Sequence, residues 1–245
     1  MQDAHLVGGH GPHSWIVVAD GVGDATMSQH ASRAAVESVN TYLARNLLER
    51  PNREMMLKAL THAREAVLTL ADELGVGHDD VATTLALAVF TGSEVAAAAI
   101  GDSSILALTK TDRLSGGCSL VPFCSAPQPQ ARDPDAEGIV HLAHPWWMDY
   151  VETSHKSSSR ITALLLATDG AGNFFSDGFT DNADFDPELT AAYQDFITDN
   201  GPLNAGAYLA GFMMKYEGVD CDDRTLVIAS KIPFGQFPGL DALSQ

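Results

Sequence analysis

The chain has 245 residues and carries 32 Asp and Glu against 14 Lys and Arg, which gives a formal charge of −18 at pH 7. This charge repels nucleic acids and anionic membrane surfaces at long range, so a function that depends on binding polyanions is disfavoured. Hydrophobic residues make up 45% of the sequence, a share typical of a globular protein rather than a disordered one.

The sequence also limits the location of the protein. Its three cysteines are an odd number without the paired spacing of a zinc site, which favours a reducing compartment. The first residues do not combine a basic region with an apolar core, and no apolar run is as long as a membrane span. We therefore expect a cytoplasmic protein with one domain over residues 1–245 that binds neither membranes nor nucleic acid.

The first third of the chain predicts a hairpin and two helices. A Gly-Pro turn between His10 and His13 joins two short strands, the second of which is residues 14–20. A helix can begin at Ser28, and Pro51 stops it. A second helix follows from about Arg53 to Leu74, with Gly75 at its C-terminal cap. Apolar residues recur at every fourth position of the first helix, at Ala31, Ala35, Val39, Leu43 and Leu47.

The middle of the chain predicts further strands. Two apolar runs, residues 82–90 and 94–100, are joined by three residues, which predicts an antiparallel hairpin. Residues 104–110 are expected to be the third strand of the same meander. The pattern then fades into Gly, Pro, Ser and Asp over residues 111–159, which we interpret as a flap or loop region.

The last third predicts a strand at residues 161–170, helices at 187–199 and 202–218, and a final strand at 224–232. Strands and helices therefore occur in separate runs, without the strict alternation of a doubly wound parallel sheet. This order favours an α+β fold, in which antiparallel strands form layers and helix pairs lie outside them.

Four acidic positions lie at the ends of apolar runs. Asp20, Asp102 and Asp169 each follow such a run, and Asp222 stands just before the last strand. Each of them alone fits an Asx turn. If they converge, their oxygens suit Mg²⁺ or Mn²⁺, and without cations they would repel one another. Gly21 has no side chain and would let the chain turn so that its carbonyl faces an ion held by Asp20.

The chain resembles the PP2C-type metal-dependent protein phosphatases, especially their compact bacterial members, over nearly its whole length. The resemblance rests on six short motifs that occur in the family's order. It implies a four-layer αββα sandwich, in which two antiparallel sheets are flanked by helix pairs. The matching stretches are MQDA at 1–4, DGVGD at 20–24, VATTLALAV at 81–89, IGDSS at 100–104, ATDGA at 167–171 and DDRT at 222–225.

The resemblance also implies roles for single residues. Asp20 bridges two metal ions, the carbonyl of Gly21 binds one of them, and Asp169 and Asp222 complete the ligands of the first. These acids act in catalysis through the water or hydroxide that bridges two Mn²⁺ or Mg²⁺ ions and attacks phosphorus. Two further positions complete the set: Asp102 matches an acid that helps to hold a possible third ion, and Asp3 lies in the second shell near bound water.

The activity implied is hydrolysis of a phosphomonoester, usually phosphoserine or phosphothreonine in a protein, with a Ser/Thr kinase as a possible counterpart. Several family features are altered. The family commonly has an arginine shortly before the stretch that matches residues 1–4, and the sequence has none there. Asp24, Ala82 and Ser104 replace two motif glycines and the arginine of Gly-Asp-Ser-Arg. Three arginines are candidates for the phosphate anchor: Arg33, Arg160 and Arg224.

These departures leave two alternatives to an active phosphatase. One is a pseudophosphatase, a phosphoprotein-binding or regulatory module that keeps the fold with weak or no turnover. The other uses Asp20 as a covalent phosphoryl acceptor, and Val22 disfavours it because those phosphatases have a second aspartate there. The pair Trp146 and Trp147 also has two interpretations, as a partner-binding patch or as a clamp that fastens a loop onto the core.

Overall fold

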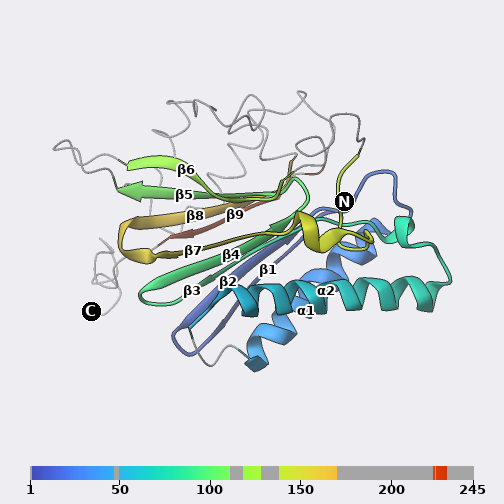
Figure 1. The fold of residues 1–245 in the computed structure, drawn as a ribbon, viewed down its shortest axis with the longest axis horizontal. Coiled ribbons are helices and arrows are strands. Elements are labelled where there is room, and N and C mark those ends of the chain that lie inside the picture. Colours follow the sequence, from blue (N-terminus) through green and yellow to red (C-terminus); the bar gives the residue numbers. More distant parts are fainter. Residues whose placement is uncertain are drawn as a thin grey trace, which may run out of the picture.

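The computed structural model describes residues 2–46, 50–110, 118–127, 138–169, 223 and 225–230. Two antiparallel sheets stack face to face, and two long helices cover the outer face of the first sheet (Figure 1). The predicted α+β class is therefore confirmed. The first sheet has the order β1-β2-β3-β4-β7, with β1 Ala4–His10, β2 His13–Ala19, β3 Leu85–Phe90, β4 Glu94–Ile100 and β7 Glu152–Ser157. The second sheet has the order β6-β5-β8-β9, with β5 Ser104–Lys110, β6 Cys118–Ser125, β8 Ile161–Ala167 and β9 Leu226–Ser230.

Helix α2 (Arg53–Leu74) has the bounds that its caps and apolar periodicity predict, and α1 (Ser28–Asn46) begins at the predicted Ser28 but ends at Asn46, before the Pro51 that was expected to stop it. The side chain of Asn52 accepts a hydrogen bond from the backbone N–H of Met55 at 2.9 Å and so caps the first turn of α2. Gly75 ends α2 with φ of 68°, in the left-handed region. The predicted apolar stripe of α1 is fully buried as far as Leu43, and Leu47 lies outside the described residues.

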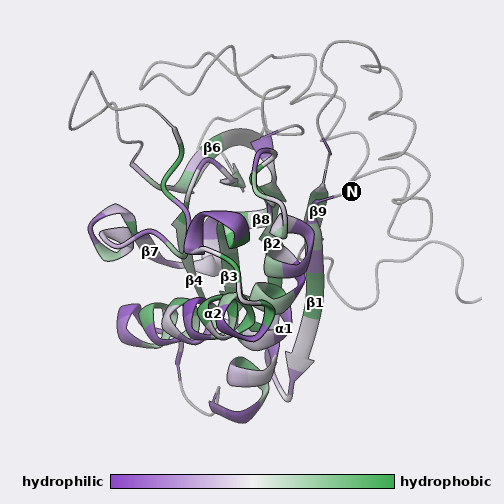
Figure 2. Ribbon diagram, turned by 90° about the vertical axis from the view of Figure 1, so that its right-hand side faces the viewer, coloured by the Kyte–Doolittle hydropathy of each residue, from purple (hydrophilic) through white to green (hydrophobic). Residues whose placement is uncertain are grey.

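Two apolar layers hold the sandwich together. Side chains alternate between the two faces of each strand, so Trp15 and Val17 of β2 pack under the helices while Ile16 and Val18 face the second sheet. Both faces of the first sheet are therefore buried at its centre, which explains why β2, β3 and β4 are nearly continuous apolar runs. In Figure 2 the inner strands are mostly green, and purple segments occur mainly in the helices and connections.

The predicted hairpin of β3 and β4 is confirmed, but the expectation that residues 104–110 continue this meander is wrong. β5 leaves the first sheet and pairs with β6 and β8 in the second. The change of sheet occurs at Gly101, which follows β4 with φ of 90°. A Cβ atom at Gly101 would lie 2.5 Å from Cγ2 of Thr84, so only glycine fits this turn.

The expected flap or loop region, residues 111–159, contains two strands. β6 pairs with β5, and β7 pairs with β4 at the far edge of the first sheet. The sequence of β7, ETSHKS, is mostly polar because the strand lies at an exposed edge, so it lacks the apolar signal of an inner strand. Three 3₁₀ turns complete the described elements: η1 His78–Val81, η3 Trp147–Tyr150 and η4 Ser158–Arg160.

Two of the predicted elements, the helices at 187–199 and 202–218, lie outside the described residues. β9 lies within the strand predicted at 224–232. Among the described helices, neither α1 nor α2 has the length and apolar character needed to cross a lipid bilayer.

We predict that Gly75→Ala lowers the free energy of unfolding by about 1–2 kcal/mol, because an L-residue pays this cost in the left-handed region. The added methyl group meets no atom within 4 Å, so the loss comes from backbone conformation alone. Urea unfolding measures it. Gly92→Ala is the matched control, since its Cβ also meets open space and its φ is not positive. Equal losses in the two variants would contradict this explanation.

Candidate active site

Three of the four predicted acidic positions lie at one end of the sandwich, and the fourth, Asp222, is outside the described residues. Asp20 follows β2, Asp102 follows β4 and Asp169 follows β8. Because neighbouring strands are antiparallel, the ends of β2, β4 and β8 coincide with the starts of β3, β5 and β9. This end lies on the right of Figure 1, beside the N-terminus. The fold therefore gathers carboxylates from both sheets at the same edge.

Two threonines fix the backbone of Asp20. The hydroxyl of Thr83 donates to the carbonyl of Asp20 at 2.9 Å, and the amide of Thr84 donates to the same carbonyl at 2.8 Å. The amide of Asp20 donates to the hydroxyl of Thr84 at 3.1 Å, and this hydroxyl also pairs with that of Ser103 at 2.9 Å. All four residues are buried. The side chain of Asp20 is thus held on a rigid backbone.

A second set of hydrogen bonds ties the N-terminal segment to the second sheet. The hydroxyl of Thr168 donates to Oδ2 of Asp3 at 2.8 Å and accepts from the amide of Thr225 at 3.0 Å. The amide of Gln2 donates to the carboxylate of Asp223. Sequence reasoning named Asp3 but missed its partner Thr168, although a hydroxyl residue directly before Asp169 is visible in the sequence.

The carboxyl group of Asp20 interacts with those of Asp3 and Asp169. Burial, followed by the hydrogen-bonded carboxyl group of Asp169 and by the charge of Asp3, raises the pKa of Asp20 to about 10. Burial also raises the pKa of Asp3. This effect outweighs the hydrogen bonds to its carboxylate, which favour the charged form and lower the pKa. In the absence of a cation, Asp20 therefore keeps its proton at neutral pH. A cation would favour the charged form.

The donor set fits a hard divalent cation. Oδ1 of Asp3 is buried, and among the described residues the carboxyl group of Asp20 is the hydrogen-bonding side chain beside Asp3 that could serve it. A carboxyl group in this position can share a proton with Asp20, or it can bind a water molecule or a cation. Within the described part of the chain, no three His, Cys, Asp or Glu side chains are already arranged to hold a metal ion. Asp222, an expected ligand, lies outside the described residues.

Gly21 is required for a reason other than the expected turn. Its φ is not positive, so the chain does not need glycine there for a left-handed conformation. A Cβ atom at Gly21 would instead lie 2.9 Å from the carbonyl oxygen of Gln2 and 2.9 Å from Cβ of Ser28. The start of α1 and the N-terminal segment therefore approach Asp20 closely only because residue 21 has no side chain.

The altered motif positions have different environments. Asp24 is exposed, as in a loop carboxylate, and Asp102 is half-buried in the turn between β4 and β5. Ala82 is buried, and its carbonyl accepts a hydrogen bond from the amide of Val22 at 3.1 Å. Ser104 is buried at the start of β5, where the family motif has arginine. The sequence therefore lacks a cation at this position beside the acids.

The arginines proposed as phosphate anchors are not equivalent. Arg160 ends η4, directly before β8, whereas Asp169 follows the other end of that strand. β8 has seven residues, which span ~23 Å at a rise of ~3.3 Å per residue, so Arg160 and the acids lie at opposite ends of this strand. This separation rules out Arg160 as an anchor. Arg33 is exposed on α1, and Arg224 lies outside the described residues.

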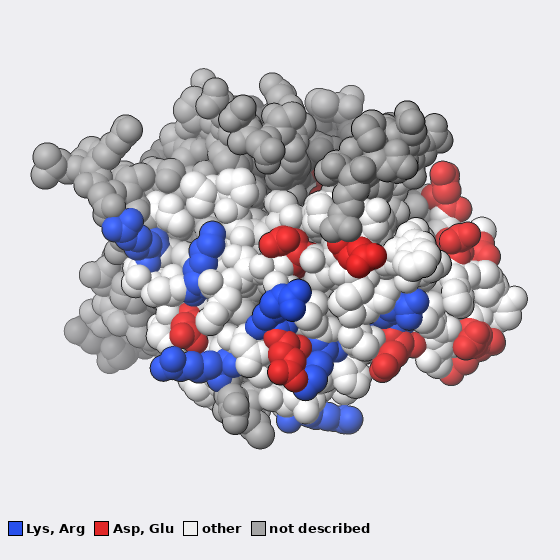
Figure 3. Space-filling view, viewed as in Figure 1, with Lys and Arg blue, Asp and Glu red and all other residues white. Residues whose placement is uncertain are grey.

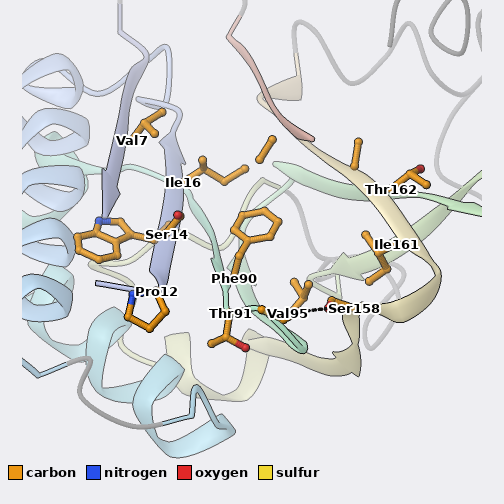
Figure 4. A pocket seen from close by; sticks show the side chains of 14 residues that line it. Val7, Pro12, Ser14, Ile16, Phe90, Thr91, Val95, Ser158, Ile161 and Thr162 are labelled. Atoms are coloured by element: carbon orange, nitrogen blue, oxygen red, sulfur yellow. Dashed lines mark hydrogen bonds between the residues drawn. The ribbon is translucent and has the colours of Figure 1, made fainter. Parts of the chain in front are cut away.

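A cavity of about 430 Å³ opens at the other end of the sandwich (Figure 4). Ile16, Phe90, Val95 and Ile161 line it, and none of the described residues around it is charged. Ser158, also in its lining, donates a hydrogen bond to the carbonyl of Gly92 at 3.3 Å. The cavity opens near the start of β2, whereas Asp20 follows its end. It is therefore separate from the acidic site.

The comparisons with known proteins agree with the fold. A family model described as Protein phosphatase 2C matches residues 1–212. A solved bacterial serine phosphatase is similar at a TM-score of 0.68 and 16% identity, over 94% of this chain and 91% of that chain. Serine/threonine phosphatase Stp1 from Staphylococcus aureus gives 0.68 and 17%, over 94% and 89%. RsbX in complex with magnesium gives 0.52 and 12%, over 93% and 85%.

No curated protein sequence gives a significant match. The sequence identities to the solved structures are low, so those structures show a similarity of fold alone. The family match is independent of them and covers most of the chain. With the two stacked antiparallel sheets, it shows that the chain belongs to the protein phosphatase 2C family.

Proposed function

We propose that the protein is a metal-dependent phosphomonoester hydrolase that acts on phosphoserine or phosphothreonine in proteins. The observation that carries the proposal is the buried carboxyl group of Asp20 beside those of Asp3 and Asp169, where the two sheets meet. Membership of the protein phosphatase 2C family supports the same reaction. A Ser/Thr kinase that supplies the phosphorylated protein is part of the proposal.

Two Mn²⁺ or Mg²⁺ ions are the proposed cofactors. Asp20, Asp169, Asp222 and the carbonyl of Gly21 would hold them, and Asp102 would help to hold a third. Ions bound there supply Lewis acidity, which lowers the pKa of water and offsets charge on the phosphoryl oxygens. The surface favours cations as well, because acidic side chains prevail along the right-hand edge of the face in Figure 3.

In this proposal the residues of the chain hold the carboxylates in position and accept protons. Hydrogen bonds from Thr83 and Thr84 hold the backbone of Asp20, so its carboxylate needs little reorganisation when it loses its proton. Thr168 occupies Oδ2 of Asp3 and leaves Oδ1 to accept a hydrogen bond from the attacking water. No protein nucleophile is needed, since water attacks phosphorus directly.

A pseudophosphatase remains the second candidate. Its support is the loss of one cation: Ser104 stands where the family has arginine, and Arg160 lies at the opposite end of β8 from the acids. If neither Arg33 nor Arg224 binds the phosphate, substrate binding depends on the metal ions and on contacts away from the phosphate. A protein of this kind would bind a phosphoprotein and release phosphate slowly or not at all.

We predict that chelator-stripped protein regains phosphate release from p-nitrophenyl phosphate when Mn²⁺ is added. Asp20→Asn and Asp169→Asn each lower kcat/KM by at least about a hundredfold, because even groups that only orient metal ligands are worth 10–100-fold. Asp24→Asn is the control, since that carboxylate is exposed in the same loop. No turnover in the parent, with Mn²⁺ binding intact, would favour the pseudophosphatase.

The raised pKa of Asp20 predicts how stability varies with pH in the metal-free protein. Folded Asp20 keeps its proton until about pH 10, whereas the unfolded chain loses it near pH 4, so stability falls as pH rises between these values. We expect the melting temperature of the metal-free parent to drop from pH 5 to pH 9, and that of Asp20→Asn to drop less. An identical decline in both proteins would refute the assignment to Asp20.

The same pKa predicts that metal binding is linked to proton release. Mn²⁺ requires the carboxylate of Asp20, so binding at pH 7 releases about one proton from this residue. Calorimetry in buffers of different ionisation enthalpy measures the number released. Asp20→Asn should release fewer protons than the parent, and Asp24→Asn should match the parent.

A further inference from the structure

The cavity at the end of the sandwich away from the acids is an apolar surface that reaches solvent. It lies between the two sheets, where Ile16 of β2, Phe90 of β3 and Ile161 of β8 surround the same space (Figure 4). Val7 also lines the cavity, and its side chain is 65% exposed. Removing such a surface from water is favourable, so the cavity favours an apolar occupant.

The hydroxyl groups in the lining do not require a polar ligand. The hydroxyl of Thr162 donates to the carbonyl of Leu108 at 2.9 Å, and that of Thr91 accepts from the amide of Glu94 at 3.0 Å. Ser158 is bonded to a backbone carbonyl as described above. A polar occupant would therefore lose its hydration without gaining hydrogen bonds from these three groups.

The chain itself leads to this cavity. β9 pairs antiparallel with β8, from Leu226 opposite Ala167 at the acidic end to Ser230 opposite Ala163 at the other end. Ala163 and Ala229 both line the cavity. The residues that follow β9 therefore begin at the rim of the cavity.

The sequence after β9 has the apolar character that the cavity favours. Residues 231–240, KIPFGQFPGL, carry one charged side chain, that of Lys231, and lie outside the described residues. Phe234 is four residues beyond Ser230 and Phe237 is seven, so an extended chain can carry them about 13 and 23 Å from the end of β9 at ~3.3 Å per residue. Proline and glycine stand near both phenylalanines and favour a turn of the chain over a longer strand.

The size of the cavity also fits aromatic side chains. An apolar cavity of ~150 Å³ binds benzene. A cavity of about 430 Å³ therefore has room for two phenylalanine rings.

We propose that residues 231–240 fold back onto the cavity and fill it with the side chains of Phe234 and Phe237. The contact would also hold β9, which among the described strands pairs with β8 alone. The proposal does not depend on the proposed function, because the cavity and the acids lie at opposite ends of the sandwich. The match to the family model ends at residue 212, so the segment lies outside the matched region. The competing occupants are a separate apolar molecule and the same segment of a second copy.

Binding of the neutral fluorescent probe N-phenyl-1-naphthylamine to the full chain tests this proposal. The parent should bind the probe weakly, because the segment competes for the cavity. The double variant Phe234→Ala, Phe237→Ala should bind it at least about tenfold more tightly, since burial of one phenylalanine side chain is worth more than this factor. Adding Ser14→Phe to the double variant should remove the binding, because Ser14 lines the cavity on the same face of β2 as Ile16.

Two control variants should bind the probe as weakly as the parent. Gln236→Ala changes the same segment but keeps both phenylalanines. Trp146→Ala removes an exposed aromatic side chain, 69% accessible, that is not part of the cavity lining, whereas its neighbour Trp147 packs in the core.

Three outcomes would overturn the proposal. Equally tight binding by the parent and the double variant would assign the cavity to a separate apolar molecule. Weak binding by both would show that the two phenylalanines do not fill it. A dimer of the parent that the double variant loses, measured by analytical ultracentrifugation, would assign the segment to a second copy.

A cross-linking measurement avoids the double variant if that protein does not fold. With p-benzoylphenylalanine in place of Phe234, irradiation should link this position to β2, β3 or β8 of the same chain at the residues that line the cavity. Mass spectrometry of the digested protein identifies the linked residues. Links to other parts of the chain alone would contradict the proposal.

Discussion

The burial of a carboxyl group beside two others is the constraint on which the acidic end of the molecule depends. Asp20 sits where water is largely excluded, and its neighbours Asp3 and Asp169 carry the same kind of group. Such an arrangement opposes folding unless a proton or a cation compensates the charge. The hydrogen bonds of Thr83 and Thr84 keep Asp20 in this position, so the backbone is organised around a group that is unfavourable without a ligand.

Local patterns predicted much of the first sheet and its helices, because their signals lie within a few residues. The caps of α2 at Asn52 and Gly75 and the short link between β3 and β4 are of this kind. The sheet to which β5 belongs could not be predicted in the same way. Gly101 turns the chain away from its neighbour, and the partners of β5 come from distant segments. β7 was missed because an exposed edge strand needs no apolar alternation.

For the candidate site, the sequence singled out Asp3, Asp20 and Asp169, which interact in the structure, but not what positions them. Asp20 and Asp169 were recognisable because each follows an apolar run. The hydroxyl partner Thr168 was not, because a threonine between a strand and an acid is common and gains meaning only from its contact with Asp3. The prediction that position 21 needs glycine was correct, but the predicted reason was a turn of the chain. The cause, close approach of Gln2 and Ser28, is visible only in three dimensions.

The alanines between the two sheets link packing to chemistry. Ala86 and Ala88 of β3, with Ala97 and Ala99 of β4, face the second sheet, and small side chains let two sheets lie close together. Asp20 belongs to the first sheet and Asp169 to the second, so the separation of the sheets sets the separation of these acids. A methyl group added far from the site would widen the gap between the acids, so the size of the core side chains adjusts the spacing of the two carboxyl groups.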